Sequence, residues 1–142
     1  MVFPYAEVNT AQRERLIALV NRLSDDDLMY TVEHGWTIAT VLVHLAFWDR
    51  HRWLILKQWQ HDGQLPPQTP DPINDVVAIL SAAIPPRAAA KLAVEAAETL
   101  DRELEKLTPE QVEALESVGM NRLLNRSLHR EEHLNQIQQV FH

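Results

Sequence analysis

Apolar residues recur along this chain at the spacing of a helix face, and nowhere do β-branched residues alternate as in a strand. Leu16, Leu19, Val20 and Leu23 show the helical spacing clearly. Only 3 glycines occur against 8 prolines, which favours helices with firm ends over a turn-rich β-fold. With 142 residues, 46% of them apolar, the chain has the size and composition of one globular domain. We therefore predict an all-α fold with a single domain spanning residues 1–142.

The pattern divides into four main helices. The first starts at Asn9 or Thr10, whose side chains can cap free backbone N–H groups. The other three cover about 37–60, 86–106 and 121–140, and shorter helices are predicted at about 73–83 and from 109 to near 119.

A long break separates the second and third main helices. Residues 62–72 contain four prolines and Gly63, and we predict a surface connection without helix there. Further along, Thr108 and Gln111 have the spacing of a capping box. Four main helices with one long connection and short accessory helices predict a four-helix bundle.

Charge and composition exclude several classes of function. The formal net charge is −7 with no basic stripe, so nucleic acid is not an expected partner. The longest stretch without charged residues, 34–48, is too short to span a bilayer, and the first residues do not resemble a signal peptide. We therefore expect a cytoplasmic protein without a membrane partner. The chain has no cysteine, so any reactive thiol must come from a separate molecule.

Seven histidines are the main indication of a site. His44 shares a helix face with apolar residues and is expected to point into the bundle, and His51 lies two turns further on nearly the same face. His129 and His133 are four residues apart, so their imidazoles lie on one face of the last helix. Two imidazoles at this spacing can bind one divalent ion, and a third from a facing helix would complete a three-nitrogen site.

The same spacing is compatible with two ordinary roles. A single inward histidine such as His44 is commonly a hydrogen-bonded core residue. Apart from Leu128, residues 127–133 are all polar or charged, which also fits a solvated helix face. Spacing by itself leaves the metal site and these alternatives open, as well as the choice between His44 and His51.

Two motifs resemble those of the DinB-like (YfiT-like) metalloenzyme superfamily. Gly-Trp-Thr at 35–37, followed by His44 and Leu-Ala-Phe-Trp-Asp at 45–49, is similar to its second-helix signature. His-Arg-Glu-Glu-His-Leu-Asn-Gln-Ile at 129–137 is similar to its closing motif. The resemblance implies a four-helix bundle in which His44, His129 and His133 hold zinc, nickel or a similar ion; His51 has no match in the motifs.

The resemblance also implies a chemistry. Characterised relatives include transferases and isomerases that use small thiols such as bacillithiol or mycothiol. A bound divalent ion lowers the pKa of a thiol or of water. We therefore expect a thiol-dependent S-transferase or a metal-water hydrolase acting on a small electrophilic substrate. The alternative is a metal-free bundle that binds a small ligand or sequesters a toxic metabolite without catalysis.

Other residues are weaker candidates. Trp48, one turn from His44, is expected to form a pocket wall, whereas the other three tryptophans are expected in the core. Arg126 lies one turn before His129 and is a candidate contact for an anionic substrate; its alternative is a surface arginine. Glu131 and Glu132 are expected on a solvated face, with a role near the metal as the alternative.

A homodimer is expected as well. The predicted second helix carries apolar side chains away from its core-facing stripe, which favours association through helix faces. These side chains are Phe47, Trp53 and Leu54.

Overall fold

The computed structural model describes residues 2–67 and 72–141, and within these ranges it contains helices and no β-strand. The helices are α1 (Ala6–Arg22), α2 (Ile38–Asp62), α3 (Ile73–Ser81), α4 (Pro86–Leu104), α5 (Pro109–Ser117), α6 (Asn121–Leu124) and α7 (Ser127–Gln138), with single 3-10 turns at Asp27–Met29 and Glu33–Gly35. The predicted all-α class is confirmed. Part of the predicted connection, residues 68–71, lies outside the described residues.

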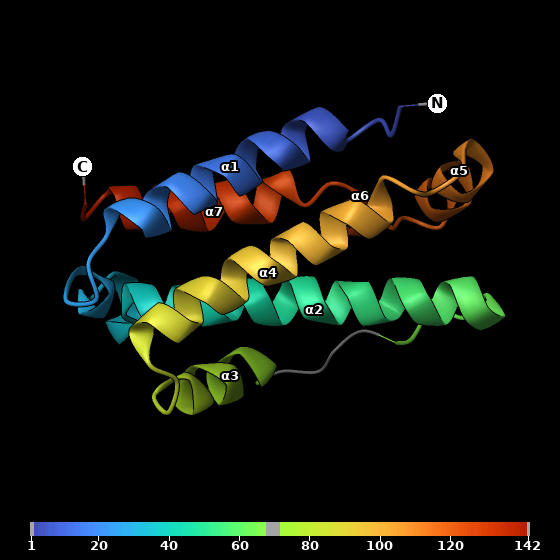
Figure 1. Ribbon diagram of the computed structural model, residues 1–142. Coiled ribbons are helices and arrows are strands. Elements are labelled where there is room, and N and C mark those ends of the chain that lie inside the picture. Colours follow the sequence, from blue (N-terminus) through green and yellow to red (C-terminus); the bar gives the residue numbers. More distant parts are fainter. Residues whose placement is uncertain (1, 68–71, 142) are drawn as a thin grey trace.

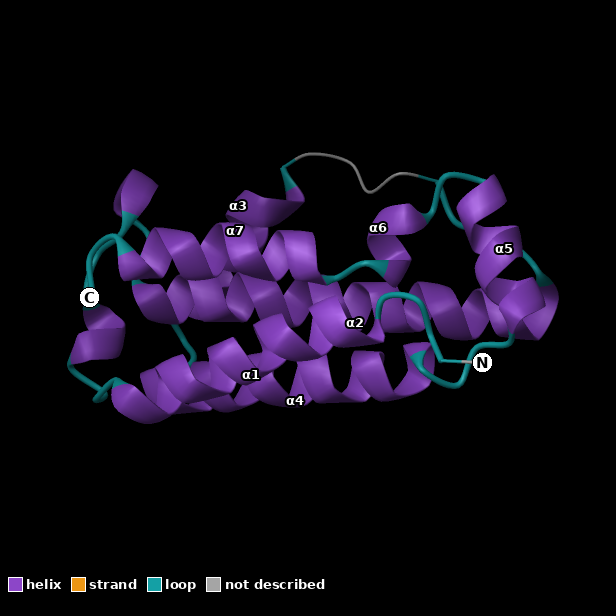
Figure 2. Cartoon of the chain, turned by 90° about the horizontal axis from the view of Figure 1, so that it is seen from above, coloured by secondary structure: helices purple, strands orange, loops and turns teal. Residues whose placement is uncertain are grey.

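The four main helices α1, α2, α4 and α7 lie alongside one another, with α5 and α6 at one end (Figures 1 and 2). Helices α2 and α4 run in the same direction, because the segment that contains α3 returns the chain to the end of the bundle where α2 begins. Helices α1 and α7 run the opposite way. In this arrangement α2 packs against both α4 and α7, so the second and last helices are neighbours, as the predicted three-histidine site requires.

The core is built around α2. One face of α4 presents five buried alanines to the core, and small side chains let two helices approach closely. Buried leucines from α1, α2 and α7 belong to the same core cluster as several of these alanines. None of the described helices combines the length and the apolar character needed to cross a membrane.

Local sequence signals mark both ends of α2 and the start of α5. The Thr37 hydroxyl accepts a hydrogen bond from the Thr40 N–H at 3.1 Å and starts α2 where predicted. Gly63 ends α2 with a φ of 74°, a left-handed conformation that favours glycine. Thr108 and Gln111 form the predicted capping box at the start of α5.

The predicted start of the first helix is wrong. Helix α1 begins at Ala6, and Tyr5 before it provides no side-chain cap. Asn9 therefore lies inside the helix, where its side chain is only 2% exposed. A buried amide needs partners for both its oxygen and its nitrogen, and Asn9 finds them on the last part of the chain.

The predicted single helix over 121–140 is also wrong, because it is broken between α6 and α7. The Asn9 side-chain nitrogen donates to the Leu124 carbonyl at 2.9 Å. Its side-chain oxygen accepts from the backbone N–H groups of Arg126 and Ser127 at 2.8 and 3.0 Å. One side chain from α1 thus satisfies the end of one helix and the start of the next. The Asn125 side-chain oxygen also accepts from the Ser127 N–H at 3.1 Å, but the cap that Asn9 supplies comes from a distant segment and cannot be predicted from the local sequence.

The surface proposed for dimerisation is only partly exposed. Leu54 is 61% exposed, whereas Phe47 and Trp53 are partly buried and pack against the core. The homodimer stays a prediction.

The Asn9 bridge makes a first testable prediction. Replacing Asn9→Ala leaves buried backbone groups without partners, and we expect the free energy of unfolding to fall by about 1–3 kcal/mol. The exposed Asn21, also on α1, provides a matched control, since Asn21→Ala is expected to change it by less than about 0.5 kcal/mol. Urea denaturation measures both. Equal losses in the two variants would contradict the role given to Asn9.

Candidate metal centre

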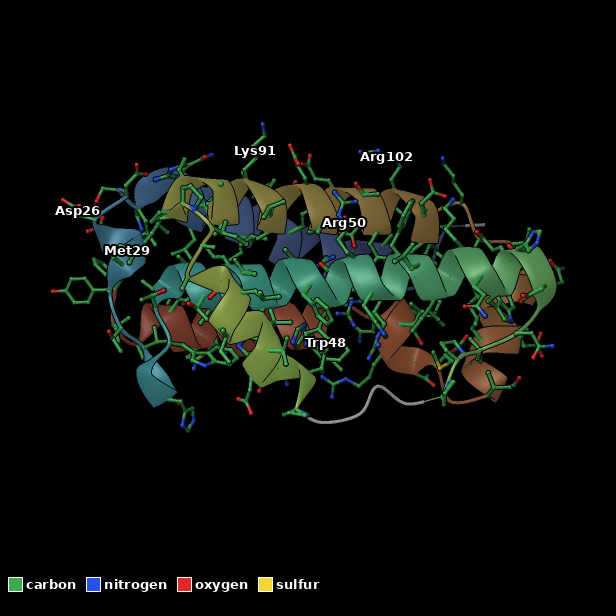
Figure 3. The ribbon with its side chains drawn as sticks, turned by 90° about the horizontal axis from the view of Figure 1, so that it is seen from below. Asp26, Met29, Trp48, Arg50, Lys91 and Arg102 are labelled. Atoms are coloured by element: carbon green, nitrogen blue, oxygen red, sulfur yellow. The ribbon has the colours of Figure 1, made fainter. Side chains whose placement is uncertain are left out.

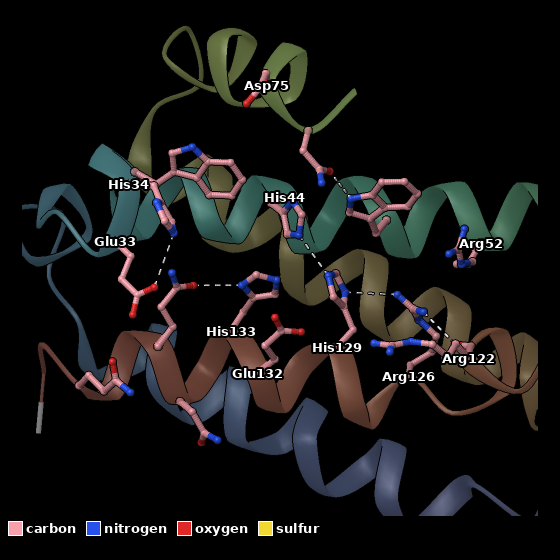
Figure 4. Close-up of a pocket in the computed structure, with 16 residues that line it drawn as sticks. Glu33, His34, His44, Arg52, Asp75, Arg122, Arg126, His129, Glu132 and His133 are labelled. Carbon is pink, nitrogen blue, oxygen red and sulfur yellow. Dashed lines mark hydrogen bonds and ion pairs between the residues drawn. The ribbon is translucent and has the colours of Figure 1, made fainter. Parts of the chain in front are cut away.

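Three imidazoles meet where α2 faces α7. His44 comes from α2, and His129 and His133 project from successive turns of α7 (Figure 4). One ligand nitrogen from each ring lies within 4.8 Å of the others. The Nε2 atoms of His44 and His129 are 3.1 Å apart. The structure thus brings together the three histidines predicted as metal ligands.

His51 lies outside this group. Its ring packs against those of Phe47 and Trp48, with centroids 6.0 and 5.1 Å away. Its Nδ1 lies 3.0 Å from the Nη1 of Arg52.

Burial keeps the imidazoles of His44 and His129 neutral. His44 is 5% exposed, and loss of solvent, together with the charge of His133, lowers its pKa to about 4. Burial, followed by the charge of Arg126, lowers the pKa of His129 to about 2. Since only a neutral imidazole coordinates a metal ion, both rings are in the ligating form at neutral pH.

His133 is oriented by a neighbour on its own helix. Its Nδ1 lies 3.1 Å from the side-chain oxygen of Gln136. An amide oxygen only accepts hydrogen bonds, so Nδ1 carries the proton and the lone pair of Nε2 is available for an ion. Gln136 belongs to the closing motif of the sequence, but the spacing of residues did not reveal its role.

The donor set fits a divalent transition-metal ion. Three neutral nitrogen donors suit zinc or nickel, and ligands from two facing helices leave further coordination positions open. In addition, the buried Nδ1 of His44 has no hydrogen-bond partner within the described part of the chain. The ring of His44 is thus held through its Nε2, which lies at hydrogen-bond distance from the Nε2 of His129, and not through its Nδ1.

The histidines line a pocket of about 920 Å³ that opens to solvent. Trp48 lies on its wall, as predicted, and its indole nitrogen donates to the Asn74 side-chain oxygen at 2.8 Å, beside the first turn of α3 (Figure 3). Trp36 also lines the pocket, although the sequence suggested a core position. The centroid of its ring lies 5.3 Å from that of the His44 ring. Trp53 and Trp59 pack against the core as expected.

Arg126 is not a surface residue. Its side chain is 3% exposed, and its Nε donates to a carboxylate oxygen of Asp49 at 2.9 Å. Its Nη1 donates to the Arg122 carbonyl at 2.9 Å, and its Nη2 lies 3.4 Å from the His129 Nδ1. Arg126 lines the pocket, and its contact with a substrate stays a prediction.

Arg130 is the largest fully buried side chain among the described residues. It was not identified from the sequence as a functional or core residue. It donates to Asp101 from both Nη atoms, each at 2.8 Å, and to Asp49 at 3.1 Å. It also reaches the backbone carbonyl of Asn9 at 3.1 Å, while Arg13 of α1 pairs with Asp101 at 2.6 Å. These contacts join α1, α2, α4 and α7.

The network could not be predicted from the sequence, because residues 127–133 are mostly polar and resemble a solvated helix face. Glu131 and Glu132 are exposed, as a solvated face predicts, and Glu132 also lines the pocket beside the histidines (Figure 4). Arg130, between His129 and Glu131, points into the bundle. Arg126 and Arg130 are four residues apart, which places them on one face, but arginines at that spacing are ordinary on a surface. The two aspartates that they pair with lie on other helices.

The comparison with known protein families now adds to this geometry. Residues 10–127, well over half of the chain, match the family model described as the mycothiol maleylpyruvate isomerase N-terminal domain. The chain belongs to this family. The mycothiol maleylpyruvate isomerase N-terminal domain is a member of the DinB-like helical superfamily, which confirms the resemblance found in the sequence. The match includes His44 and ends two residues before His129. No curated protein and no solved structure matches the chain.

The Asp49 pairing makes a second prediction. Asp49→Asn leaves the buried Arg126 without a carboxylate partner, so we expect the free energy of unfolding to fall by about 3–5 kcal/mol. Asp25 forms an exposed ion pair with Arg87, and Asp25→Asn is expected to cost no more than about 1 kcal/mol. Chemical denaturation of both variants compares them. A similar small loss in each would show that the buried network does not stabilise the bundle.

The lowered pKa of His44 makes a third prediction. Its folded-state pKa, about 4, lies below the ordinary histidine value of 6.5, so the unfolded chain takes up the proton first as pH falls. The metal-free protein is therefore expected to lose stability between about pH 6.5 and pH 4. Urea denaturation at several pH values, with a chelator present, measures this. His44→Gln should reduce the pH dependence, whereas the same substitution at the exposed His61 should not; equal pH dependence in parent and His44→Gln would contradict the burial effect.

Proposed function

We propose that this chain is a divalent-metal-dependent enzyme that transfers a small thiol to an electrophilic substrate, with His44, His129 and His133 holding zinc or nickel. The observation that carries the proposal is the convergence of three imidazole nitrogens within 4.8 Å in a pocket open to solvent. A metal that served structure alone would favour a closed set of four protein ligands, whereas three ligands and an open pocket are typical of catalytic sites.

The thiol must come from a soluble cofactor, because the chain has no cysteine. A pocket of about 920 Å³ is large enough for a small thiol and a substrate together. The family is named for a mycothiol maleylpyruvate isomerase, which favours thiol chemistry over hydrolysis by water.

When bound, a divalent ion would lower the pKa of a coordinated thiol and so supply a thiolate near neutral pH. The residues of the chain prepare the site for this. Gln136 orients His133, Trp36 packs against His44 and shields it from water, and Arg126 borders His129. Trp48 provides a flat apolar wall against which a substrate can be positioned.

Metal binding is the first test. Untagged protein is treated with a chelator, dialysed against zinc or nickel, and examined by elemental analysis. We expect about one equivalent of metal in the parent, about one in His61→Ala, and a large loss in His129→Ala. Less than about a tenth of an equivalent in the parent would contradict the metal site and favour the metal-free ligand-binding bundle.

Turnover is the second test. The metal-loaded protein is incubated with chlorodinitrobenzene or maleate, with and without a small thiol such as mycothiol. We expect product faster than in the enzyme-free mixture only when the thiol is present, and with His129→Ala a rate no higher than the enzyme-free one. Product that forms without a thiol would instead identify a hydrolase, since a three-histidine ion also activates water.

A further inference from the structure

Three arginines gather at one end of the pocket. Arg52 comes from α2, Arg122 from α6, and Arg126 from the break between α6 and α7, and all three line the cavity (Figure 4). The Nη2 of Arg126 lies 3.4 Å from His129, so this end adjoins the histidine cluster directly.

All three side-chain nitrogens of Arg126 already have partners within the protein, so none is left for a ligand. Its three nitrogens are directed at Asp49, the Arg122 carbonyl and His129, and its side chain is 3% exposed. Its charge is balanced by Asp49, which also accepts from Arg130. One carboxylate is therefore shared between two buried guanidinium groups.

Arg52 and Arg122 differ from Arg126 in this respect. Within residues 2–67 and 72–141, no salt bridge joins either of them to a carboxylate. The Arg52 guanidinium lies over the ring of Trp48, 5.2 Å from its centroid, and is partly buried. Burial lowers the pKa of Arg52, and the charges of Arg126 and Arg122 lower it further, with Asp49 opposing them.

The positive charge costs most at Arg52, which is partly buried; Arg122 also lines the cavity but is exposed to solvent. Like charges repel, and a guanidinium held partly out of water loses hydration that a carboxylate or phosphate would replace. The planar donor groups of arginine match the oxygens of both anions.

The rest of the pocket lining carries the opposite charge. Glu33 lies across the histidine cluster from the arginines, and Asp75 and Glu132 line the cavity near the histidines (Figure 4). An elongated ligand with one anionic group is therefore favoured in one orientation, with its anionic end toward the arginines and its remaining part passing the histidines.

We propose that Arg52 and Arg122 form an oxyanion-binding site, which selects a carboxylate- or phosphate-bearing small molecule and orients it next to the histidine cluster. The inference deepens the proposed function and rests on it for the meaning of the bound molecule, which is the electrophilic substrate or the thiol cofactor. Arg52 and Arg122 are positioning residues: they hold the anionic end while the chemistry takes place at the histidines.

The test uses the full chain after its metal has been removed with a chelator, so that it does not depend on metal binding or turnover. The chelator is dialysed away before the titration, because it carries carboxylates itself. Isothermal titration calorimetry measures the affinity for succinate, for inorganic phosphate and for the neutral analogue succinamide. We expect binding of succinate or phosphate but not of succinamide. Binding of succinate assigns the site to carboxylates, and binding of phosphate alone assigns it to phosphates.

Variants locate the site. Arg52→Gln and Arg122→Gln are each expected to weaken anion binding about tenfold or more, because each removes a charged donor. Arg52→Lys keeps the charge and should retain part of the affinity, which separates loss of charge from loss of packing on Trp48. The control is Arg102→Gln, since Arg102 projects outward from α4 and is expected to leave binding unchanged (Figure 3).

Three results would overturn the proposal: no binding of either anion, equal binding of succinamide, or unchanged affinity in the Arg52→Gln and Arg122→Gln variants. A protein that binds anions but no metal would support this site and contradict the proposed enzyme. A protein that binds metal but no anion would contradict this site and leave the proposed metal centre supported.

Discussion

The buried pairing of Arg130 with Asp49 and Asp101 is the interaction on which the rest of the bundle depends. Arg130 is 1% exposed, and its carboxylate partners stand on α2 and α4. A buried charge is tolerated only when its partners are placed closely enough to replace water. Helix α7 therefore has one register in which Arg130 meets both aspartates, and a shift of one residue would leave the charges unpaired in the core. The network selects this arrangement of helices over others with equally good apolar packing.

The same pairing reaches the candidate metal centre. Asp49 accepts from Arg126 as well as Arg130, and Arg126 lies against His129. His44 is five residues before Asp49 on the same helix, so the contact that sets the register of α7 against α2 also brings the imidazoles together. Asn9 contributes by ending α6 and starting α7 at the point where Arg126 must turn inward. Fold and site thus share one set of polar contacts. Among the described residues, that sharing leaves Arg52 and Arg122 at the edge of the pocket without a salt bridge to a carboxylate.

The fold class and the histidines could be predicted from the sequence because both are expressed locally. Helical periodicity, the Thr37 cap and the Thr108 capping box depend on neighbours a few residues away. His129 and His133 share a face through helix geometry alone, and the choice of His44 over His51 came from resemblance to a family. The inward turn of Arg130 could not be predicted, because a run of polar residues is typical of a solvated surface and its aspartate partners are distant in the sequence.

The sequence by itself thus determined the helices, their approximate limits and the shared face of His129 and His133, since each follows from spacing along one helix. The choice of His44 needed the family resemblance. Tertiary structure decided where the last helix breaks, which charges are buried and which line the pocket. The physical reason is the same in each case. A buried polar group requires a partner, and in this protein the partners of Asn9, Arg126 and Arg130 stand on other segments of the chain. Only when α1, α2, α4 and α7 are packed together does it become clear which polar residues are inside and which arginines remain available to a ligand.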